Sequence, residues 1–197
     1  MFHTWDRLCL VAVAKNILRV LRKLHQCNVL VGDLNPDNIL VEPDESVCLV
    51  DVDSYQLEDF ACPVGSPRFT APGLLGKNFS TLLRTQDDEL FALAVVIFAV
   101  LFLGEYPYFG GNEAQYQESV KKGCFVYQFK DGSRDLRPAV GPARCIWSHL
   151  SQPLKHAFTR IFANGQRVQT QEFLWLLEGY AKEIETKDSS NAVGPAS

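Results

Sequence analysis

Apolar residues in this chain follow two spacings, one typical of helices and one typical of buried strands. Residues 5–25 carry apolar side chains every three or four positions, with basic residues on the opposite side, which predicts an amphipathic helix. Residues 39–41 and 47–50 are short apolar runs on either side of a turn-forming segment, which predicts a β-hairpin. Residues 90–103 are apolar without a break. That run is shorter than the ~20 residues of a membrane span, so it predicts a helix buried on all sides.

Cap and stop residues mark the ends of the expected helices. Thr4 is expected to cap the first helix, with Asp6 in its first turn, and Gly104 is expected to end the buried helix. Asn112 is expected to cap a helix over residues 113–122. The remaining expectations are helices over residues 154–162 and after Thr170, and mostly loop over residues 56–62, 65–72 and 124–142.

These elements predict one domain over residues 1–186, mainly α with a small β-hairpin. No internal repeat or second domain is visible, and 197 residues suffice for one hydrophobic core. Residues 187–197 are small, polar and aperiodic, which predicts a disordered tail.

Composition and charge narrow the classes of partner. The formal net charge is −4 and no Lys/Arg cluster stands out, so no nucleic-acid partner is expected. No secretory signal is evident and no membrane span is expected. The six cysteines form no Cys-x-x-Cys pair, which is typical of reduced thiols in a cytoplasmic protein.

Three polar residues interrupt the apolar sequence around the hairpin. Asn38 precedes its first strand and Asp51 follows its second, so hairpin pairing would bring these two side chains together. Carboxylate and amide oxygens suit Mg²⁺, which otherwise keeps waters and phosphate oxygens as ligands. Asp33, on the loop leading in, would lie nearby. Asp and Asn also cap turns, and this structural role remains an alternative for either residue alone.

Four motifs in register resemble the protein kinases. Residues 33–38 read Asp-Leu-Asn-Pro-Asp-Asn, and a hairpin ending in Asp51 follows. Residues 65–72 resemble the end of a Ser/Thr-kinase activation segment, and residues 103–110 resemble the loop after the central helix of those enzymes. The set is similar to bacterial eukaryotic-like Ser/Thr kinases with a Gly-Asp-Leu-Asn-Pro catalytic loop.

The resemblance covers residues 5–185 and only the C-terminal lobe of the kinase fold. No Gly-rich loop is found upstream of Asp33, so we expect a kinase-like C-lobe that lacks the N-terminal β-lobe.

The resemblance implies Mg²⁺ and ATP as cofactors and gives each site residue a role. Asp33 would accept the proton of the substrate hydroxyl, beside Asn35. Asn38 and Asp51 would hold Mg²⁺ on the ATP phosphates, Asp53 could add a carboxylate to the metal, and Leu40 would lie under the adenine.

The substrate-facing part of the activation segment contains Ser66 and Phe69. Ser66 stands where Ser/Thr kinases have a Thr that contacts the catalytic Asp, and its hydroxyl is expected to make that contact.

Several residues depart from the kinase pattern. Val31-Gly32 replaces the His-Arg before the catalytic Asp, so no phosphorylated activation loop can be anchored there. Asn35 replaces a Lys and supplies no positive charge. Glu89 replaces an Asp at the start of the central helix and is expected to brace the catalytic loop poorly. Gly73 replaces the Glu that would pair with Arg167, so Arg167 is expected to be exposed or to have another partner.

Three functions are compatible with these features. The first is phosphoryl transfer from Mg-ATP to a protein Ser/Thr hydroxyl, needing an N-lobe, so that the chain alone is expected to be inactive. The second is an inactive, pseudokinase-like scaffold whose surface facing the missing N-lobe docks a partner protein. A distant third is an aspartate-nucleophile phosphatase, because residues 47–53 also resemble its apolar strand with Asp-x-Asp.

Overall fold

The computed structural model describes residues 6–127 and 142–192 of the chain. Most of these residues are helical. The helices are α1 (Arg7–Gln26), α2 (Gln86–Leu101), α3 (Glu113–Lys121), α4 (Pro142–His149), α5 (Gln152–Phe162) and α6 (Thr170–Ala192). The strands are β1 (Val29–Leu30), β2 (Ile39–Val41), β3 (Val47–Leu49) and β4 (Gln56–Leu57). Short 3₁₀ turns are η1 (Pro36–Asn38), η2 (Val52–Ser54), η3 (Pro67–Phe69), η4 (Pro72–Leu74) and η5 (Phe79–Thr81).

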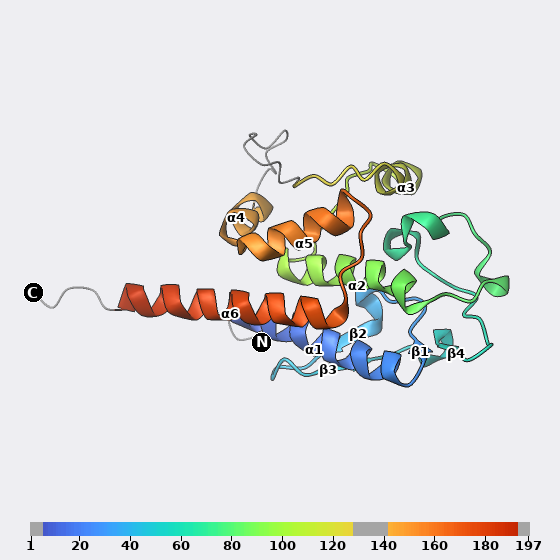
Figure 1. The fold of residues 1–197 in the computed structure, drawn as a ribbon, viewed down its shortest axis with the longest axis horizontal. Helices are drawn as coiled ribbons and strands as arrows, with labels where there is room; N and C mark the ends of the chain where they lie inside the picture. The colour runs from blue at the N-terminus through green and yellow to red at the C-terminus, as the bar shows by residue number, and fades with distance from the viewer. Residues whose placement is uncertain (1–5, 128–141, 193–197) are drawn as a thin grey trace, which may run out of the picture.

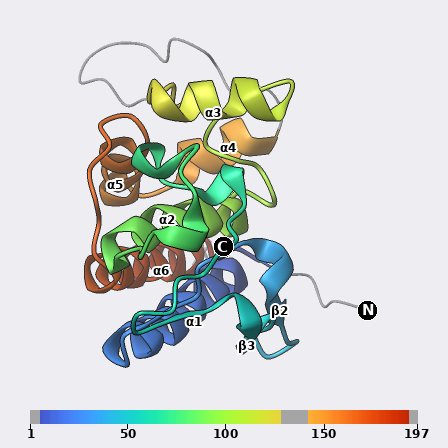
Figure 2. The ribbon, with the colours of Figure 1, turned by 90° about the vertical axis from the view of Figure 1, so that its right-hand side faces the viewer.

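Helix α2 forms the centre of the fold, with α4 and α5 on one side and α1 and α6 on the other (Figure 1). The view at right angles gives the same order of layers (Figure 2). Residues 89–99 and Leu101 of α2 are all buried, as the unbroken apolar run from Leu90 predicts. Phe98 stacks on Phe102 with ring centroids 4.0 Å apart and meets the edge of Phe158 at 5.2 Å. Such aromatic pairs stabilise a core beyond the area they bury.

The strands form two separate antiparallel pairs. β2 pairs with β3, with Leu40 opposite Cys48, which confirms the predicted hairpin. β1 pairs with β4, with Leu30 opposite Gln56. The sequence suggested a loop at β4, and this expectation was wrong because a two-residue strand is too short to show a period of two. The second pair joins the segment after the hairpin to the segment before Asp33.

Helix starts follow from local capping. Helix α1 begins after Asp6, whose carboxylate accepts the Cys9 N–H at 2.9 Å, so Asp6 takes the cap role expected of Thr4. Thr4 itself lies outside the described residues. Thr85 and Asp88 form a reciprocal capping box at the start of α2. Asn112 caps α3 as predicted, through the Gln115 N–H at 2.9 Å.

Two helices in the second half go beyond the sequence expectations. Helix α4 begins at Pro142, the last residue of the segment expected to be mostly loop, and continues over residues for which no element was predicted. Helix α6 continues to Ala192, so residues 187–192 are helical although a disordered tail was expected. Residues 193–197 of that tail, and residues 128–141 of the loop, lie outside the described part.

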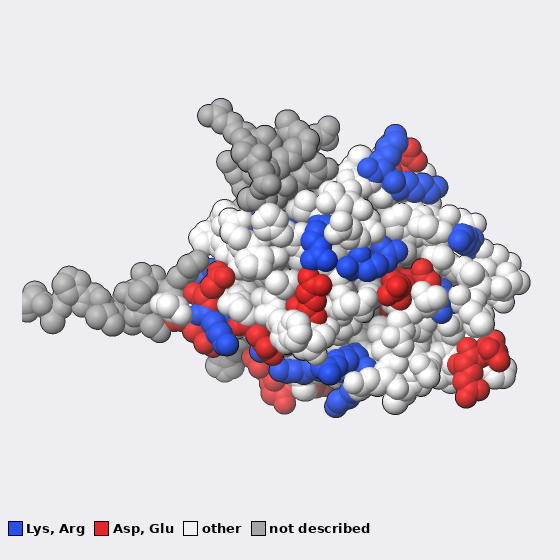
Figure 3. All heavy atoms as spheres, in the orientation of Figure 1, with Lys and Arg blue, Asp and Glu red and all other residues white. Residues whose placement is uncertain are grey.

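Charged side chains of both signs are interspersed over the face in Figure 3, without a broad basic area among the residues described there. No helix in the described ranges is long and apolar enough to cross a membrane.

Candidate active site

The loop between β1 and β2 is held in shape by its own asparagines. The side-chain amides of Asn35 and Asn38 each donate to the Asp33 carbonyl oxygen at 3.0 Å. Asn35 also accepts the Asp37 N–H at 2.9 Å and so caps η1. Since Asn35 is buried and these bonds converge on one residue, the backbone of Asp33 has a fixed position. We refer to residues 31–38 as the catalytic loop.

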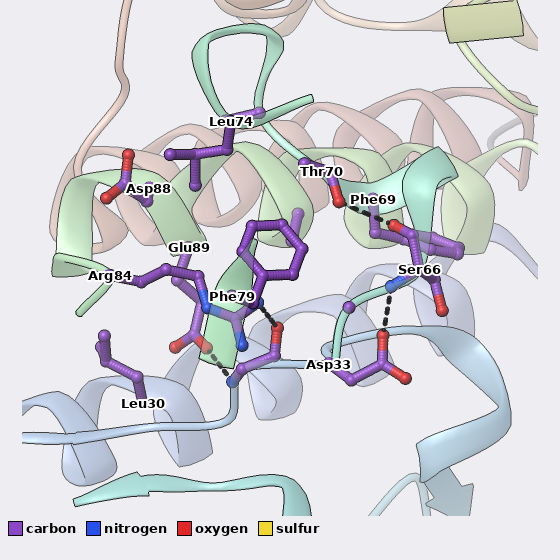
Figure 4. A pocket seen from close by; sticks show the side chains of 14 residues that line it. Leu30, Asp33, Ser66, Phe69, Thr70, Leu74, Phe79, Arg84, Asp88 and Glu89 are labelled. Atoms are coloured by element: carbon purple, nitrogen blue, oxygen red, sulfur yellow. Dashed lines mark hydrogen bonds between the residues drawn. The ribbon is translucent and has the colours of Figure 1, made fainter. Parts of the chain in front are cut away.

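The Asp33 carboxylate reaches the segment that precedes α2. Its Oδ1 accepts the backbone N–H of Ser66 at 2.7 Å (Figure 4). The Ser66 hydroxyl was expected to make this contact, and the backbone amide makes it instead. The approach is possible because Gly65 has no side chain: a Cβ there would lie 2.8 Å from the Phe79 ring. One carboxylate oxygen is thus oriented by the protein, which leaves the other available for a substrate.

The hairpin brings Asn38 to the strand that ends at Asp51. The Val50 N–H donates to the Asn38 carbonyl oxygen at 3.0 Å. Asp51 follows with φ 61° and ψ 51°, a left-handed conformation that Asp tolerates better than most residues. The turn η2 then places Asp53 on the same short segment. The sequence prediction that Asn38 and Asp51 are neighbours therefore agrees with this backbone pairing.

Asp53 raises the pKa of the Asp51 carboxyl. A hydrogen bond between protonated Asp51 and Asp53 is the larger cause, the negative charge of Asp53 comes next, and Asp33 adds a smaller repulsion. Both side chains are exposed. Within the described residues no three His, Cys, Asp or Glu side chains are grouped as a metal site. A divalent cation would relieve the repulsion between these two acids, so the pair with the Asn38 amide fits Mg²⁺.

Two further predicted site residues lie at the rim. Leu40 on β2 is 51% exposed. Phe69 packs its edge on Tyr106 at 5.9 Å and lines an open groove of about 380 Å³ with Asn35 and Ser66. The groove therefore begins beside the catalytic loop.

The catalytic loop is braced from α2 by Glu89. Its Oε1 accepts the Gly32 N–H at 2.8 Å and its Oε2 lies 2.6 Å from His25 Nε2. Glu89 and His25 are both buried. The expectation that the longer Glu would brace the loop poorly was wrong, because His25 holds the carboxylate from the other side.

Arg84 is a site residue that the sequence analysis missed. Its guanidinium donates to three carbonyl oxygens, those of Gly32 at 2.6 Å, Val64 at 2.8 Å and Cys62 at 3.1 Å. Figure 4 shows the side chain extending from the start of α2 toward the catalytic loop, beside Phe79. The only sequence signal was indirect: Gly32 stands where the kinase pattern has an Arg.

Arg167 has found a partner other than a carboxylate, as predicted. Its Nε donates to the Asp87 carbonyl oxygen at 2.9 Å, and its Nη1 donates to the Gly165 carbonyl oxygen at 3.2 Å. It ties the start of α6 to the start of α2.

The fold is built on one buried helix, and a loop aspartate lies near the acidic end of a hairpin. The model of the protein kinase domain family matches residues 7–168, and the chain belongs to this family. It is similar to the protein kinase YegI of Escherichia coli K12, with 38% identity over 169 residues, 79% of this chain and 26% of that protein.

Two eukaryotic kinases are more distantly similar. The serine/threonine-protein kinase stk11 homolog of Dictyostelium discoideum is 29% identical over 63% of this chain and 22% of its own length. A calcium and calcium/calmodulin-dependent serine/threonine-protein kinase of Pisum sativum is 26% identical over 87% of this chain and 31% of its own length. The chain thus spans less than a third of each of these relatives.

Proposed function

We propose that this chain is the C-terminal lobe of a protein kinase, and that it carries the residues that orient a protein Ser/Thr hydroxyl for phosphoryl transfer from Mg-ATP. The observation that carries the proposal is the arrangement of Asp33. One oxygen of its carboxylate is held by the Ser66 N–H, and its backbone is held by Asn35 and Asn38. A fixed carboxylate at the mouth of a groove suits a group that orients a hydroxyl and accepts its proton.

The residues divide the work as follows. Mg-ATP supplies the transferable phosphoryl group when bound. Asn38, Asp51 and Asp53 would hold the metal, and Leu40 would contribute apolar surface for the base. Asp33 would accept the proton of the attacking hydroxyl as the phosphoryl group passes to the hydroxyl oxygen and ADP leaves. The open groove of about 620 Å³ that Asp33 lines with Gly65 and Lys77 receives the substrate chain.

Nucleotide binding by the purified chain tests the proposal. We expect ATP with Mg²⁺ to raise its melting temperature, and Asp51→Ala to abolish the shift. A ligand at a hundredfold excess over its Kd stabilises the folded state by about 2.7 kcal/mol. Asp44→Ala, which removes an exposed carboxylate from the hairpin turn, is the matched control and should keep the shift. No shift at millimolar ATP would reject autonomous nucleotide binding.

The scaffold function remains the second candidate, because large apolar side chains are exposed on the hairpin and on the stretch that follows it. Leu40 on β2 is 51% exposed, and Val52 and Phe60, after Asp51 in the chain, are 64% and 77% exposed. Exposed apolar groups of this size are typical of protein contacts. Asn35, which brings no charge to a transferring phosphate, also favours this candidate. Equal binding of the partner protein by the wild-type chain and by the Asp33→Asn variant would support the scaffold function.

The phosphatase alternative finds no support in this fold. That enzyme class needs an alternating α/β domain after the Asp-x-Asp strand, whereas the described residues after Asp53 contain one two-residue strand and are otherwise helical or irregular.

A further inference from the structure

Arg84 occupies space that exists because residue 32 is a glycine. Gly32 has φ 78°, and a Cβ there would lie 2.6 Å from Cys62 Sγ, 2.6 Å from the Ser54 carbonyl oxygen and 2.9 Å from Arg84 Nη2. A larger residue at position 32 would therefore displace the guanidinium. The cation that the kinase pattern places at this point of the catalytic loop is supplied here from a position 52 residues away.

The backbone of Arg84 is fixed as firmly as its side chain. The buried Gln56 amide donates to the Arg84 carbonyl oxygen at 2.7 Å and accepts the Arg84 N–H at 2.9 Å. Gln56 belongs to β4, which pairs with β1 immediately before the catalytic loop. The guanidinium also lies over the Phe79 ring at 4.6 Å. The backbone of Arg84 is thus held by β4, which is itself paired with the strand before the catalytic loop.

The guanidinium is engaged by backbone and leaves no room for a phosphate. It bonds to three carbonyl oxygens, and the cavity beside it has a volume of about 20 Å³, close to the size of one water molecule. Its Nε is buried without a protein partner among the described residues. A phosphoryl group carries several oxygens and needs more space than this cavity offers.

The segment that Arg84 holds contains no residue to phosphorylate. Residues 56–65 include no Ser, Thr or Tyr. Of the hydroxyl residues that flank it, Ser54 is buried and donates to the carbonyl oxygens of Val31 at 3.2 Å and Asp51 at 3.0 Å. Tyr55 and Ser66 border the segment directly. The bonds from Arg84 hold residues 62–64 without an added phosphate.

We propose that Arg84 is a positioning residue that locks the catalytic loop to residues 62–64 without phosphorylation, so that the Ser66 amide stays on Asp33. The benefit of this lock for catalysis rests on the proposed function, but the contacts of Arg84 are a property of the folded chain alone. These contacts keep the site permanently assembled, so that no phosphorylation by another kinase is needed to assemble it.

The test uses Cys62, a buried thiol inside the lock, as the reporter. In Arg84→Ala, alkylation of Cys62 by iodoacetamide and hydrogen exchange of amides 62–66 should accelerate about tenfold or more, because charge-assisted bonds to the backbone are lost. Mass spectrometry resolves Cys62 from Cys9, whose rate should not change. The matched control is Arg160→Ala, which removes a 2.7 Å bond to Glu172 on α6 and should leave Cys62 protected.

Two further measurements separate a guanidinium lock from simple packing. Millimolar guanidinium, but not ammonium, should slow the reaction of Cys62 in Arg84→Ala. Arg84→Lys keeps a charge but cannot bridge three carbonyl oxygens, so its rate should lie between the wild type and Arg84→Ala. If Arg84→Ala does not fold, the lysine variant decides: a raised rate supports the proposal and a wild-type rate overturns it.

The proposal is overturned by wild-type rates in a folded Arg84→Ala, by equal rescue with ammonium, or by loss of Cys62 protection after phosphatase treatment of the wild-type chain. None of these measurements uses ATP. A chain that binds no nucleotide would therefore contradict the proposed function and leave the outcome for Arg84 unaffected.

Discussion

Glu89 and Gly32 are joined by a hydrogen bond of 2.8 Å between a buried carboxylate in α2 and the backbone N–H of the catalytic loop. His25, near the end of α1, lies 2.6 Å from the other oxygen of the same carboxylate. The end of α1 and the catalytic loop therefore meet at one side chain that lies 64 and 57 residues further along the chain. The position of Asp33 depends on this meeting point as well as on its own loop.

Removal of the Glu89 carboxylate should destabilise the protein strongly. We expect Glu89→Ala to lower the free energy of unfolding by about 3 kcal/mol, because His25 and the Gly32 N–H would remain buried without their partner. Urea denaturation measures the change, and Glu178→Ala, at an exposed position of α6, should cost about 0.5 kcal/mol or less. Equal effects of the two substitutions would contradict the brace.

Gly32 and Gly76 offer a matched pair for the effect of an added Cβ. Both have positive φ, 78° and 83°, but a Cβ at Gly76 would meet nothing within 4 Å. Gly76→Ala should cost about 1 kcal/mol, from the backbone conformation alone. Gly32→Ala should cost about 3 kcal/mol, because it adds a clash with Cys62 and Arg84. Thermal unfolding of the two variants checks the difference, and a common value would show that the space beside Gly32 can adjust.

Phe98 should be among the most costly core residues to truncate. It is fully buried in α2 and contacts the ring of Phe158 on α5 and the ring of Phe125 in the segment after α3. Phe98→Ala should cost about 3–5 kcal/mol in denaturant unfolding. Phe109→Ala, at a position that is 62% exposed, should change the stability by about 0.5 kcal/mol or less. A mild effect at Phe98 would mean that the aromatic cluster repacks.

Binding of Mg²⁺ should depend on the protonation of Asp51. Asp53 raises the pKa of Asp51, so the neutral acid persists to higher pH than in an isolated Asp. A cation binds the ionised form, and its affinity should therefore weaken as the pH falls through this raised pKa. Titration of Mg²⁺ between pH ~4 and pH ~7, a range that brackets carboxyl ionisation, measures the trend. An affinity independent of pH would place the metal elsewhere.

The same acidic pair makes a prediction without metal. A raised folded-state pKa means that the contribution of Asp51 to stability is present at low pH and is lost as the pH rises through that value. Asp53→Asn removes the charge that causes the loss and should raise the melting temperature at neutral pH. Asp44→Asn on the hairpin turn serves as the control and should have little effect; a decrease in Asp53→Asn would contradict the repulsion.

Local signals in the sequence were sufficient for the hairpin and for the buried helix. The apolar runs at residues 39–41 and 47–50 and the turn between them determine the register that brings Asn38 near Asp51. Asn112 is a cap because the helix beginning beside it is adjacent in the chain. These features need only interactions between neighbours, so the pattern of residues was enough to predict them.

Contacts between distant residues were not predictable in the same way. Arg84 lies in a polar stretch without periodicity, and its partners at Gly32 and Cys62 are 52 and 22 residues away. The kinase pattern suggested that Glu89 would brace the loop weakly. Its second contact is with His25, which lies 64 residues away in the sequence, and the local pattern gave no sign of it. Ser66 was assigned through its hydroxyl, whereas its backbone amide makes the bond. In each case the tertiary fold, and not the residue type, decides the role.

The burial of α2 on all sides also governs how the chain can fold during synthesis. Its partner α1 precedes it, but α5 and α6 emerge from the ribosome only after about sixty or more further residues at roughly 5–20 residues per second. Until then a helix whose residues 90–101 are all apolar has one face uncovered. Nascent chains that stop before α5 should therefore aggregate or recruit chaperones, and completion of α6 should release them.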